Sequence, residues 1–318
     1  MPLPAAFEGR LKIPAVAAPM FLTSGPDLVV EVSRSGMVGT FPALNARTSD
    51  GFRDWVREIK ARLAETPDAA PFGVNLIVHK SNPRLEADLA ICVEEKVPLI
   101  ITSLGAVPDL VKAVHAYGGI VFHDVISRRH AEKAAEAGVD GIIAVSAGAG
   151  GHAGQLSPFA LVTEIRQVFA GTILMAGAIN TGAQILAARA AGADLAYMGT
   201  RFIATREAMV QQAFKDMILS SSAADILYTP AISGVNANFM KPSIRAAGLD
   251  PDNLQGHAKL DMSNEAKAWK TVWSAGQGVG GIADLPGAAE LCARLGEEYR
   301  AALKALSSDA FAGARPGG

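Results

Sequence analysis

The chain has 318 residues, of which 50% are hydrophobic and 6% aromatic, and 29 basic against 31 acidic side chains give a formal net charge of −2. This length can bury a large core and indicates one large α/β domain with a smaller appendage. The balanced charge, without a basic block, argues against a nucleic-acid or anionic-membrane partner. No apolar run reaches the roughly 18 residues that span a bilayer, and Met1–Pro4 lack a signal-peptide pattern. We therefore expect a cytoplasmic protein.

The cysteines and histidines argue against disulfides and metal sites. Cys92 and Cys292 lie far apart, outside any CxxC pattern and in segments with helical spacing. We expect both to be free core thiols of a reducing compartment. The six histidines form neither HExxH nor a Cys/His cluster, so no metal site is predicted.

Eight strand-like apolar runs alternate with amphipathic helical stretches. The runs lie at 15–20, 37–42, 72–76, 99–104, 119–125, 141–146, 172–177 and 195–200. Intervening segments such as 53–64 and 127–137 have helical spacing. Strands that are apolar throughout indicate a parallel sheet covered on both faces, and eight such units close a (β/α)8 TIM barrel. An open doubly wound sheet is the alternative, but no GxGxxG follows the first strand.

The alternation changes in the last third of the chain. Residues 207–227 are predicted to be helical and 228–282 irregular, apart from a charged helical piece at 263–270. A closing helix is predicted over 286–306, with proline at its start. The predicted organisation has three parts: the barrel (1–227), a small inserted cap region (228–282), and the closing helix and tail (283–318).

The loop after the sixth strand carries the strongest candidate for chemistry. It contains four glycines around a single imidazole, His152. Ligands of TIM barrels bind at the carboxyl ends of the strands, where glycines let a ligand approach the backbone closely. Histidine is the side chain best able to exchange a proton near neutral pH. His152 is therefore a candidate catalytic base, and a solvated loop histidine is the alternative.

Small residues follow the seventh and eighth strands. These are Gly177-Ala178 and Gly199-Thr200, at the two loops that commonly bind phosphate in a barrel. Tight turns made for packing are the alternative. On the fifth strand, His123 and Asp124 are adjacent and must point to opposite faces, so one of them is expected to face the barrel interior near its mouth.

Two further positions fit a flat aromatic cofactor. Met20 follows a proline at the end of the first strand, and methionine packs adaptably against rings. The loop at 273–278, with its amide at Gln277, can fold back over a cofactor. Ordinary core packing and a plain turn are the respective alternatives.

Several of these motifs together resemble the nitronate monooxygenase family, formerly called 2-nitropropane dioxygenases, which are FMN-dependent TIM-barrel enzymes. The resemblance is carried by Pro14–Met20, Pro71–Leu76, Ala149–Gly154, Met198–Phe202 and Ala204–Glu207. The family includes enoyl-ACP reductases of the flavin type and NADH:quinone reductases with the same motifs. The motifs therefore specify the cofactor better than the substrate.

The resemblance implies FMN as the cofactor and a role for each matching residue. His152 would lie at the reactive face of the flavin, Met20 and Asn75 would contact it, Gly150 and Gly151 would lie along it, Gly177, Ala178, Gly199 and Thr200 would hold the phosphate, and Gln277 would approach the ring. The chain departs from many relatives at Ala17, Gly148 and Asp124, where they carry Gln, Glu and Lys. That lysine would help to bind the flavin and stabilise its reduced, anionic form. A carboxylate at 124 disfavours an anionic flavin unless it turns away or is neutralised.

The activity implied is FMN-dependent oxidation of alkyl nitronates by O2, with neutral nitroalkanes as further candidate substrates and His152 as general base. One alternative is an NAD(P)H-dependent flavin reductase that acts on a quinone or an enoyl thioester. Another is a barrel that binds FMN or a phosphate ligand without turnover. The expected partners are a small-molecule substrate and O2, and a homodimer is compatible with the sequence.

Overall fold

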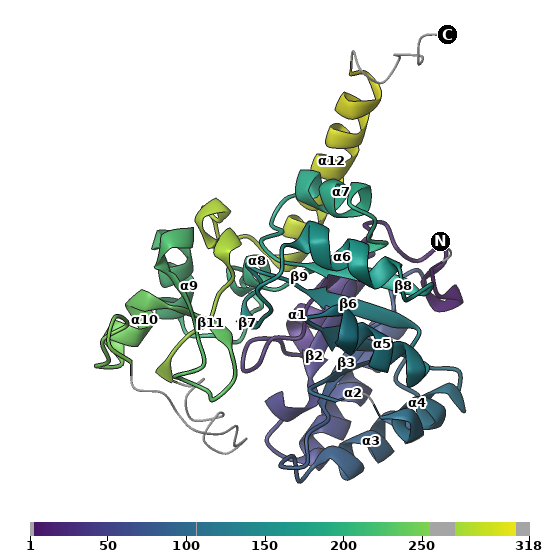
Figure 1. The fold of residues 1–318 in the computed structure, drawn as a ribbon. Coiled ribbons are helices and arrows are strands. Elements are labelled where there is room, and N and C mark those ends of the chain that lie inside the picture. The colour runs from purple at the N-terminus through teal and green to yellow at the C-terminus, as the bar shows by residue number, and fades with distance from the viewer. Residues whose placement is uncertain (1–2, 106, 255–270, 310–318) are drawn as a thin grey trace.

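The computed structural model describes residues 3–105, 107–254 and 271–309. Eight parallel strands of these residues close into a barrel in the order β1-β2-β3-β4-β5-β6-β8-β9 (Figure 1). Their bounds are β1 Ala15–Ala17, β2 Val38–Pro42, β3 Gly73–Ile77, β4 Leu99–Ser103, β5 Ile120–Val125, β6 Gly141–Val145, β8 Thr172–Ala176 and β9 Leu195–Met198. At the seam, Val16 of β1 pairs with Val38 of β2 on one side and with Tyr197 of β9 on the other. The predicted TIM barrel is confirmed. β1 ends earlier than predicted because Pro19 has no N–H to continue the ladder.

Helices cover the outside of the barrel. They are α1 Pro26–Arg34, α2 Ser49–Ala64, α3 Leu85–Glu94, α4 Pro108–His115, α5 Arg128–Glu136, α6 Pro158–Arg166, α7 Gly182–Ala190 and the short α8 Thr200–Ile203. Gly36 after α1 and Gly138 after α5 have φ of 81° and 83°. This left-handed conformation ends a helix and suits glycine.

The barrel interior is filled at one end and open at the other. A cluster of buried side chains fills the barrel interior and includes Leu99, Ile101, Phe122 and Leu174. Phe7, from a short 3-10 helix (η1, Ala5–Phe7), packs edge-on against Phe122 with ring centroids 5.9 Å apart. A second apolar layer lies between strands and helices and contains both cysteines, which are free and buried as predicted.

The last third of the chain contains strands that the sequence analysis did not predict. The segment predicted as a long helix holds α9 Gln212–Ser220 and then turns into β10 Ile226–Thr229. The segment predicted as irregular holds β11 Ala237–Met240 and α10 Lys241–Ala246. β11 pairs antiparallel with β10 and with β7, a strand of two residues, Gly151–His152. These strands are too short to show a periodic pattern, and β7 lies far from its partner in sequence.

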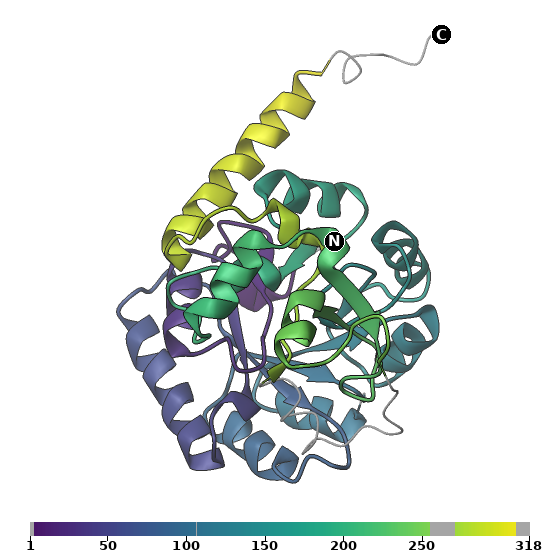
Figure 2. The ribbon, with the colours of Figure 1, turned by 90° about the vertical axis from the view of Figure 1, so that its left-hand side faces the viewer.

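The inserted sheet and the closing helix take different places around the barrel. Figure 2 shows the insertion in front of the ring of barrel helices, at the open end. The closing helix, α12 Ala288–Ser307, packs on α7 and α1 and extends away from the barrel (Figure 1). The helical piece predicted at 263–270 and the tail after 309 lie outside the described residues. In the described part of the chain, no helix combines the length and apolarity needed to cross a membrane.

Candidate active site

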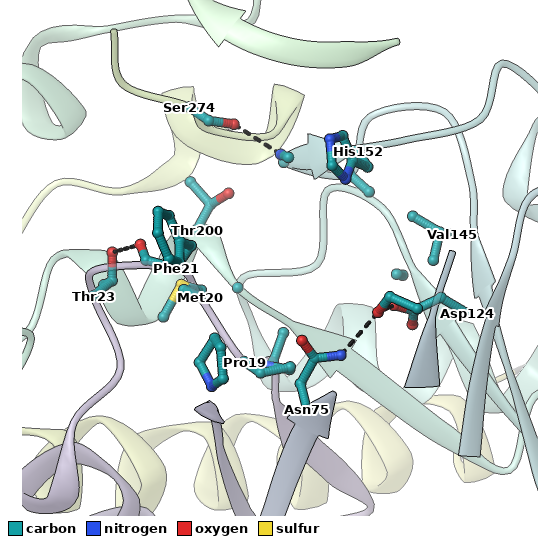
Figure 3. Close-up of a pocket in the computed structure, with 18 of the residues that line it drawn as sticks. Pro19, Met20, Phe21, Thr23, Asn75, Asp124, Val145, His152, Thr200 and Ser274 are labelled. Atoms are coloured by element: carbon teal, nitrogen blue, oxygen red, sulfur yellow. Dashed lines mark hydrogen bonds between the residues drawn. The ribbon is translucent and has the colours of Figure 1, made fainter. Parts of the chain in front are cut away.

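A cavity of about 590 Å³ opens at the carboxyl ends of the barrel strands, a size within the usual range for ligand and cofactor sites. Figure 3 shows many of its lining side chains. The lining includes all the predicted site residues except Gln277: Met20, Asn75, Asp124, Gly150, Gly151, His152, Gly177, Ala178, Gly199 and Thr200. Residues that are far apart in the sequence, from Met20 to Thr200, therefore line one cavity.

Asp124 lines this cavity from near the end of β5 Ile120–Val125. Side chains alternate along β5, so Phe122 fills the barrel interior and Asp124 reaches the same face at the open end (Figure 3). The Ser103 hydroxyl donates to Asp124 Oδ2 over 2.5 Å, and the Asn75 amide donates to Ser103 Oγ over 2.8 Å. Burial raises the pKa of the Asp124 carboxyl to about 6, although the hydrogen bond from Ser103 and the nearby His152 lower it.

His123 faces the opposite side of β5 from Asp124, as the alternation predicts. Its Nδ1 lies 2.7 Å from Thr102 Oγ1, and the side chain is buried. Burial lowers the pKa of this imidazole to about 4, so it is uncharged at neutral pH. His123 is a packing residue, and Asp124 is the member of the pair that faces the cavity.

The segment around His152 is held by the inserted sheet. The prediction of a loop is wrong for Gly151 and His152, because both belong to β7 and pair with β11. Asn238 Nδ2 donates to the Ala149 carbonyl over 2.7 Å, and the Gly151 N–H donates to Ser274 Oγ over 2.7 Å. His152 therefore sits on a backbone that is fixed from two sides.

The late loop at 273–278 folds over the cavity. Trp273, Ser274 and Gly278 line it. Gln277 is exposed, and its backbone N–H donates to the Gly148 carbonyl over 2.9 Å. The Gln277 backbone thus lies beside the glycine-rich segment. A contact of its side-chain amide with a flavin ring stays a prediction.

The loop after β8 is a strained turn. Gly177 and Ala178 have φ of 134° and 55°. A Cβ on Gly177 would lie 2.5 Å from Ser146 Oγ, so packing alone requires glycine there.

α7 starts four residues after this turn, behind a capping box of Thr181 and Gln184. The Gln184 N–H donates to Thr181 Oγ1 over 3.2 Å and the Gly182 N–H to Glu298 Oε2 of α12 over 2.7 Å, so these two N–H groups at the start of α7 already have partners.

The loop after β9 leaves more room. A Cβ on Gly199 would make only ordinary contacts, the nearest at 3.6 Å from Met20 Sδ. Thr200 Oγ1 accepts the Gly276 N–H over 2.8 Å, which leaves the hydroxyl hydrogen for another acceptor. This loop can thus offer a donor to a ligand without rearrangement.

Backbone strain gathers at this end of the barrel. Among the described residues, the non-glycine positions with positive φ are Leu22, Lys96, Leu104 and Ala178. Leu104 and Ala178 line the cavity, and Leu22 lies between two lining residues. A left-handed residue costs roughly 1–2 kcal/mol, and such strain persists mainly at functional sites. The pattern marks the cavity as the functional end.

The sequence analysis missed several lining residues. Ser103, which orients Asp124, is the last residue of β4, and its place near the end of a predicted strand was a usable signal. Tyr197, on β9, has a pKa raised by burial and by Asp124. The rings of Phe214, on α9, and Trp273, in the late loop, stack 4.9 Å apart at the mouth. The late loop was predicted to fold over a cofactor, whereas no sequence pattern places Phe214 there. Over the ranges described, no three His, Cys, Asp or Glu side chains form a metal-binding group.

A match to a known protein family identifies the kind of protein to which this cavity belongs. The profile of the nitronate monooxygenase family matches residues 9–298. The chain belongs to the nitronate monooxygenase family. It is accordingly an oxidoreductase of that family, built on a TIM barrel with a small antiparallel sheet inserted.

The relatives of this nitronate monooxygenase family member are named for different activities. A nitronate monooxygenase from Paraburkholderia phytofirmans is 28% identical, with 92% of this chain and 94% of the relative covered. A carboxyl-CoA dehydrogenase with a hydroxy-methyl-oxo-octahydroindene substrate, from Rhodococcus jostii, is 26% identical over 76% of this chain and 67% of its own length. The solved structure of FabK from Thermotoga maritima superposes with a TM-score of 0.79 at 25% identity, covering 94% of this chain and 96% of that chain. Family membership therefore leaves the substrate open.

Proposed function

We propose that this protein catalyses the FMN-dependent oxidation of alkyl nitronates by O2. One observation carries the proposal. Residues from four of the five motifs through which the chain resembles nitronate monooxygenases line a single cavity, among them Met20, Asn75, His152 and Thr200. The match to a nitronate monooxygenase over nearly the whole of both chains supports it.

The cavity fits FMN by its size and by the chemistry of its lining. Met20 and Val145 offer apolar surface for a flat ring. The loops at Gly177-Ala178 and Gly199-Thr200 are small enough for a phosphate to approach the backbone, and Thr200 has a hydroxyl hydrogen to donate. Asp124 Oδ1 is buried without a hydrogen-bond partner among the described residues, as expected of an atom that meets a ligand. When bound, FMN supplies the electron chemistry.

His152 acts as the base for neutral nitroalkanes. Its imidazole takes the proton from the carbon next to the nitro group, and the electron pair of the broken C–H bond stays on the nitronate. Preformed nitronates need no such step, and for them His152 orients the anion. The pairing of β7 with β11 holds the ring in position for both tasks.

Oxygen consumption tests this function. Purified protein is loaded with FMN, freed of excess cofactor and mixed with a preformed alkyl nitronate in an oxygen electrode. We expect O2 uptake that depends on protein and nitronate but not on NAD(P)H. Heat release should give FMN rather than FAD, because the chain has no dinucleotide fingerprint after its first strand. A protein that takes up no FMN overturns the proposal.

A reductase or dehydrogenase of acyl thioesters is the second candidate. The FabK structure and the CoA dehydrogenase relative favour it. So does the reach of the cavity, which runs from the polar loop Ser81–Arg84 to the aromatic pair Phe214 and Trp273 and can take a long substrate. Rapid NAD(P)H oxidation with an enoyl thioester or a quinone, and none of the nitronate-dependent O2 uptake, would favour this candidate. No observation favours a barrel without turnover.

A further inference from the structure

The donor and acceptor of each hydrogen bond in the chain that leads to Asp124 can be assigned in only one way. The Ile101 carbonyl can only accept, so the side-chain atom of Asn75 that lies 3.2 Å from it is the nitrogen Nδ2. The same nitrogen donates to Ser103 Oγ, which leaves the Ser103 hydrogen for Asp124 Oδ2. Oδ2 is thus an acceptor, and a proton on this carboxyl has to reside on Oδ1.

Oδ1 is the oxygen of Asp124 that has no hydrogen-bond partner within the described ranges. It is buried, while Asp124 lines the cavity. An ionised carboxylate in this position leaves a buried, unpaired oxygen, which costs more than a neutral carboxyl with its O–H turned to a ligand.

The surrounding charges do not offset an ionised Asp124. The titratable or charged side chains that line the described cavity are Arg84, His152 and Tyr197 besides Asp124 itself. Arg84 is held by Asp88 at 3.0 Å and by the Ala46 carbonyl. Tyr197, from β9, is kept neutral because burial and Asp124 raise its pKa. The hydrogen bond from Ser103 and the nearby His152, from β7, favour the ionised carboxylate, and burial outweighs both. On the far face of β5, His123 is uncharged.

We propose that Asp124 binds the flavin in its protonated form, donating a hydrogen bond from Oδ1 to an acceptor atom of the ring system. The inference rests on the proposed function, because it takes FMN as the ligand. A bound ring displaces water from the cavity that Asp124 lines and so disfavours the carboxylate further. FMN binding to protein with an ionised Asp124 therefore takes up one proton. Asp124 then acts as an uncharged hydrogen-bond donor and places no negative charge beside the flavin.

The affinity for FMN, measured against pH, tests the proposal. Quenching of FMN fluorescence gives the Kd of wild type, Asp124→Asn and the control Asp109→Asn from pH 5 to pH 9. Asp109 is an exposed carboxylate on α4. When only the protonated protein binds, the apparent Kd rises by about tenfold per pH unit above the pKa of the free carboxyl. We expect this rise in wild type and Asp109→Asn. Asp124→Asn, whose amide donates at every pH, should lack it. Because the FMN phosphate itself titrates near pH 6, the difference between variants isolates Asp124.

Calorimetry of wild type provides a second readout that needs no variant at position 124. Titration with FMN at pH 8 in buffers of different ionisation enthalpy should show uptake of about one proton per FMN. Parallel affinity profiles for wild type and Asp124→Asn, or no proton uptake by wild type, would overturn this inference and leave the flavin function standing. Absence of FMN binding to any of the three proteins would overturn both.

Discussion

At the scale of single residues, His152 gives the sharpest test of mechanism. His152→Ala should retain FMN, because the loops assigned to the phosphate are elsewhere and the pairing of β7 uses backbone only. Turnover of neutral nitroalkanes should fall by about 10²–10⁴, the usual contribution of a positioned base, whereas preformed nitronates should lose much less. Steady-state O2 uptake with the two substrate forms measures the asymmetry. His130→Ala, an exposed histidine on α5, is the matched control. Equal losses on both forms would mean that His152 binds or orients the substrate and is not a base.

The raised pKa of Asp124 predicts that the stability of the fold depends on pH. This pKa is about 6 in the folded protein against an ordinary value of 3.8. The folded state thus binds the proton more tightly, so ionisation of Asp124 destabilises the fold as pH rises from about 4 to 6, and the cost is complete above that range. Asp124→Asn should therefore be more stable than wild type at pH 8, by about 3 kcal/mol at most.

Urea unfolding of the FMN-free proteins at several pH values measures this difference. The advantage of Asp124→Asn should shrink toward zero at pH 4. His123 has the opposite effect, because its folded pKa of about 4 lowers stability as pH falls below its ordinary value of 6.5. The comparison of variant with wild type removes this contribution. A variant that is less stable than wild type at pH 8 would mean that the carboxylate stabilises the fold.

At the scale of elements, the loop between β9 and α8 tests the phosphate assignment. Gly199 is the better position for substitution, because its Cβ would meet ordinary contacts while a side chain at Gly177 would collide with Ser146. Gly199→Asp should lower the affinity for FMN at least tenfold, since like charges about 4 Å apart repel by roughly 4 kcal/mol at an effective dielectric near 20. Gly199→Ala should bind FMN nearly as wild type does. Fluorescence titration measures both, and unchanged binding by a folded Gly199→Asp would place the phosphate elsewhere.

A buried arginine and a half-exposed aspartate form an ion pair that fixes α8 to the segment before α12. The Arg201 side chain is only 3% exposed, and its Nη2 lies 2.6 Å from Asp284 Oδ1. Asp284 also binds Arg294 of α12 at 2.6 Å. Asp284→Ala removes the carboxylate and should lower the free energy of unfolding by about 1–3 kcal/mol. Asp109→Ala should change it by less than about 0.5 kcal/mol. If urea unfolding gives the two variants equal stability, the pair does not contribute.

The barrel strands could be predicted from sequence, and the insertion could not. Each barrel strand is a largely apolar run with glycine or proline near at least one of its ends, so its place follows from local chemistry. Because carboxyl ends of parallel strands meet at one edge, the strand pattern alone is enough to bring Asn75, Asp124 and Thr200 together. β7, β10 and β11 are instead short and stabilised by pairing between distant segments. Trp273 lies in the loop that was predicted to fold over a cofactor, whereas Phe214 lies on α9 and no local pattern places its ring in the cavity.

At the scale of the whole molecule, the two ends of the barrel have different tasks. Phe7 closes one end against the packed interior, and that end serves stability. The other end holds the strained turns, the buried carboxyl and the cavity, and the inserted sheet covers it (Figure 2). Insertion and barrel meet at β7, so the segment that carries His152 couples the cover to the site.

The flavin absorption spectrum under anaerobic conditions tests the central claim most directly. Purified protein loaded with FMN is mixed without oxygen with an alkyl nitronate and, separately, with NADH or NADPH. The account predicts that the nitronate alone bleaches or shifts the flavin bands, that neither nicotinamide does so at a comparable rate, and that admitting O2 restores the oxidised spectrum. A spectrum that the nitronate leaves unchanged, with rapid bleaching by NADH or NADPH, would contradict nitronate oxidation and identify a flavin reductase instead.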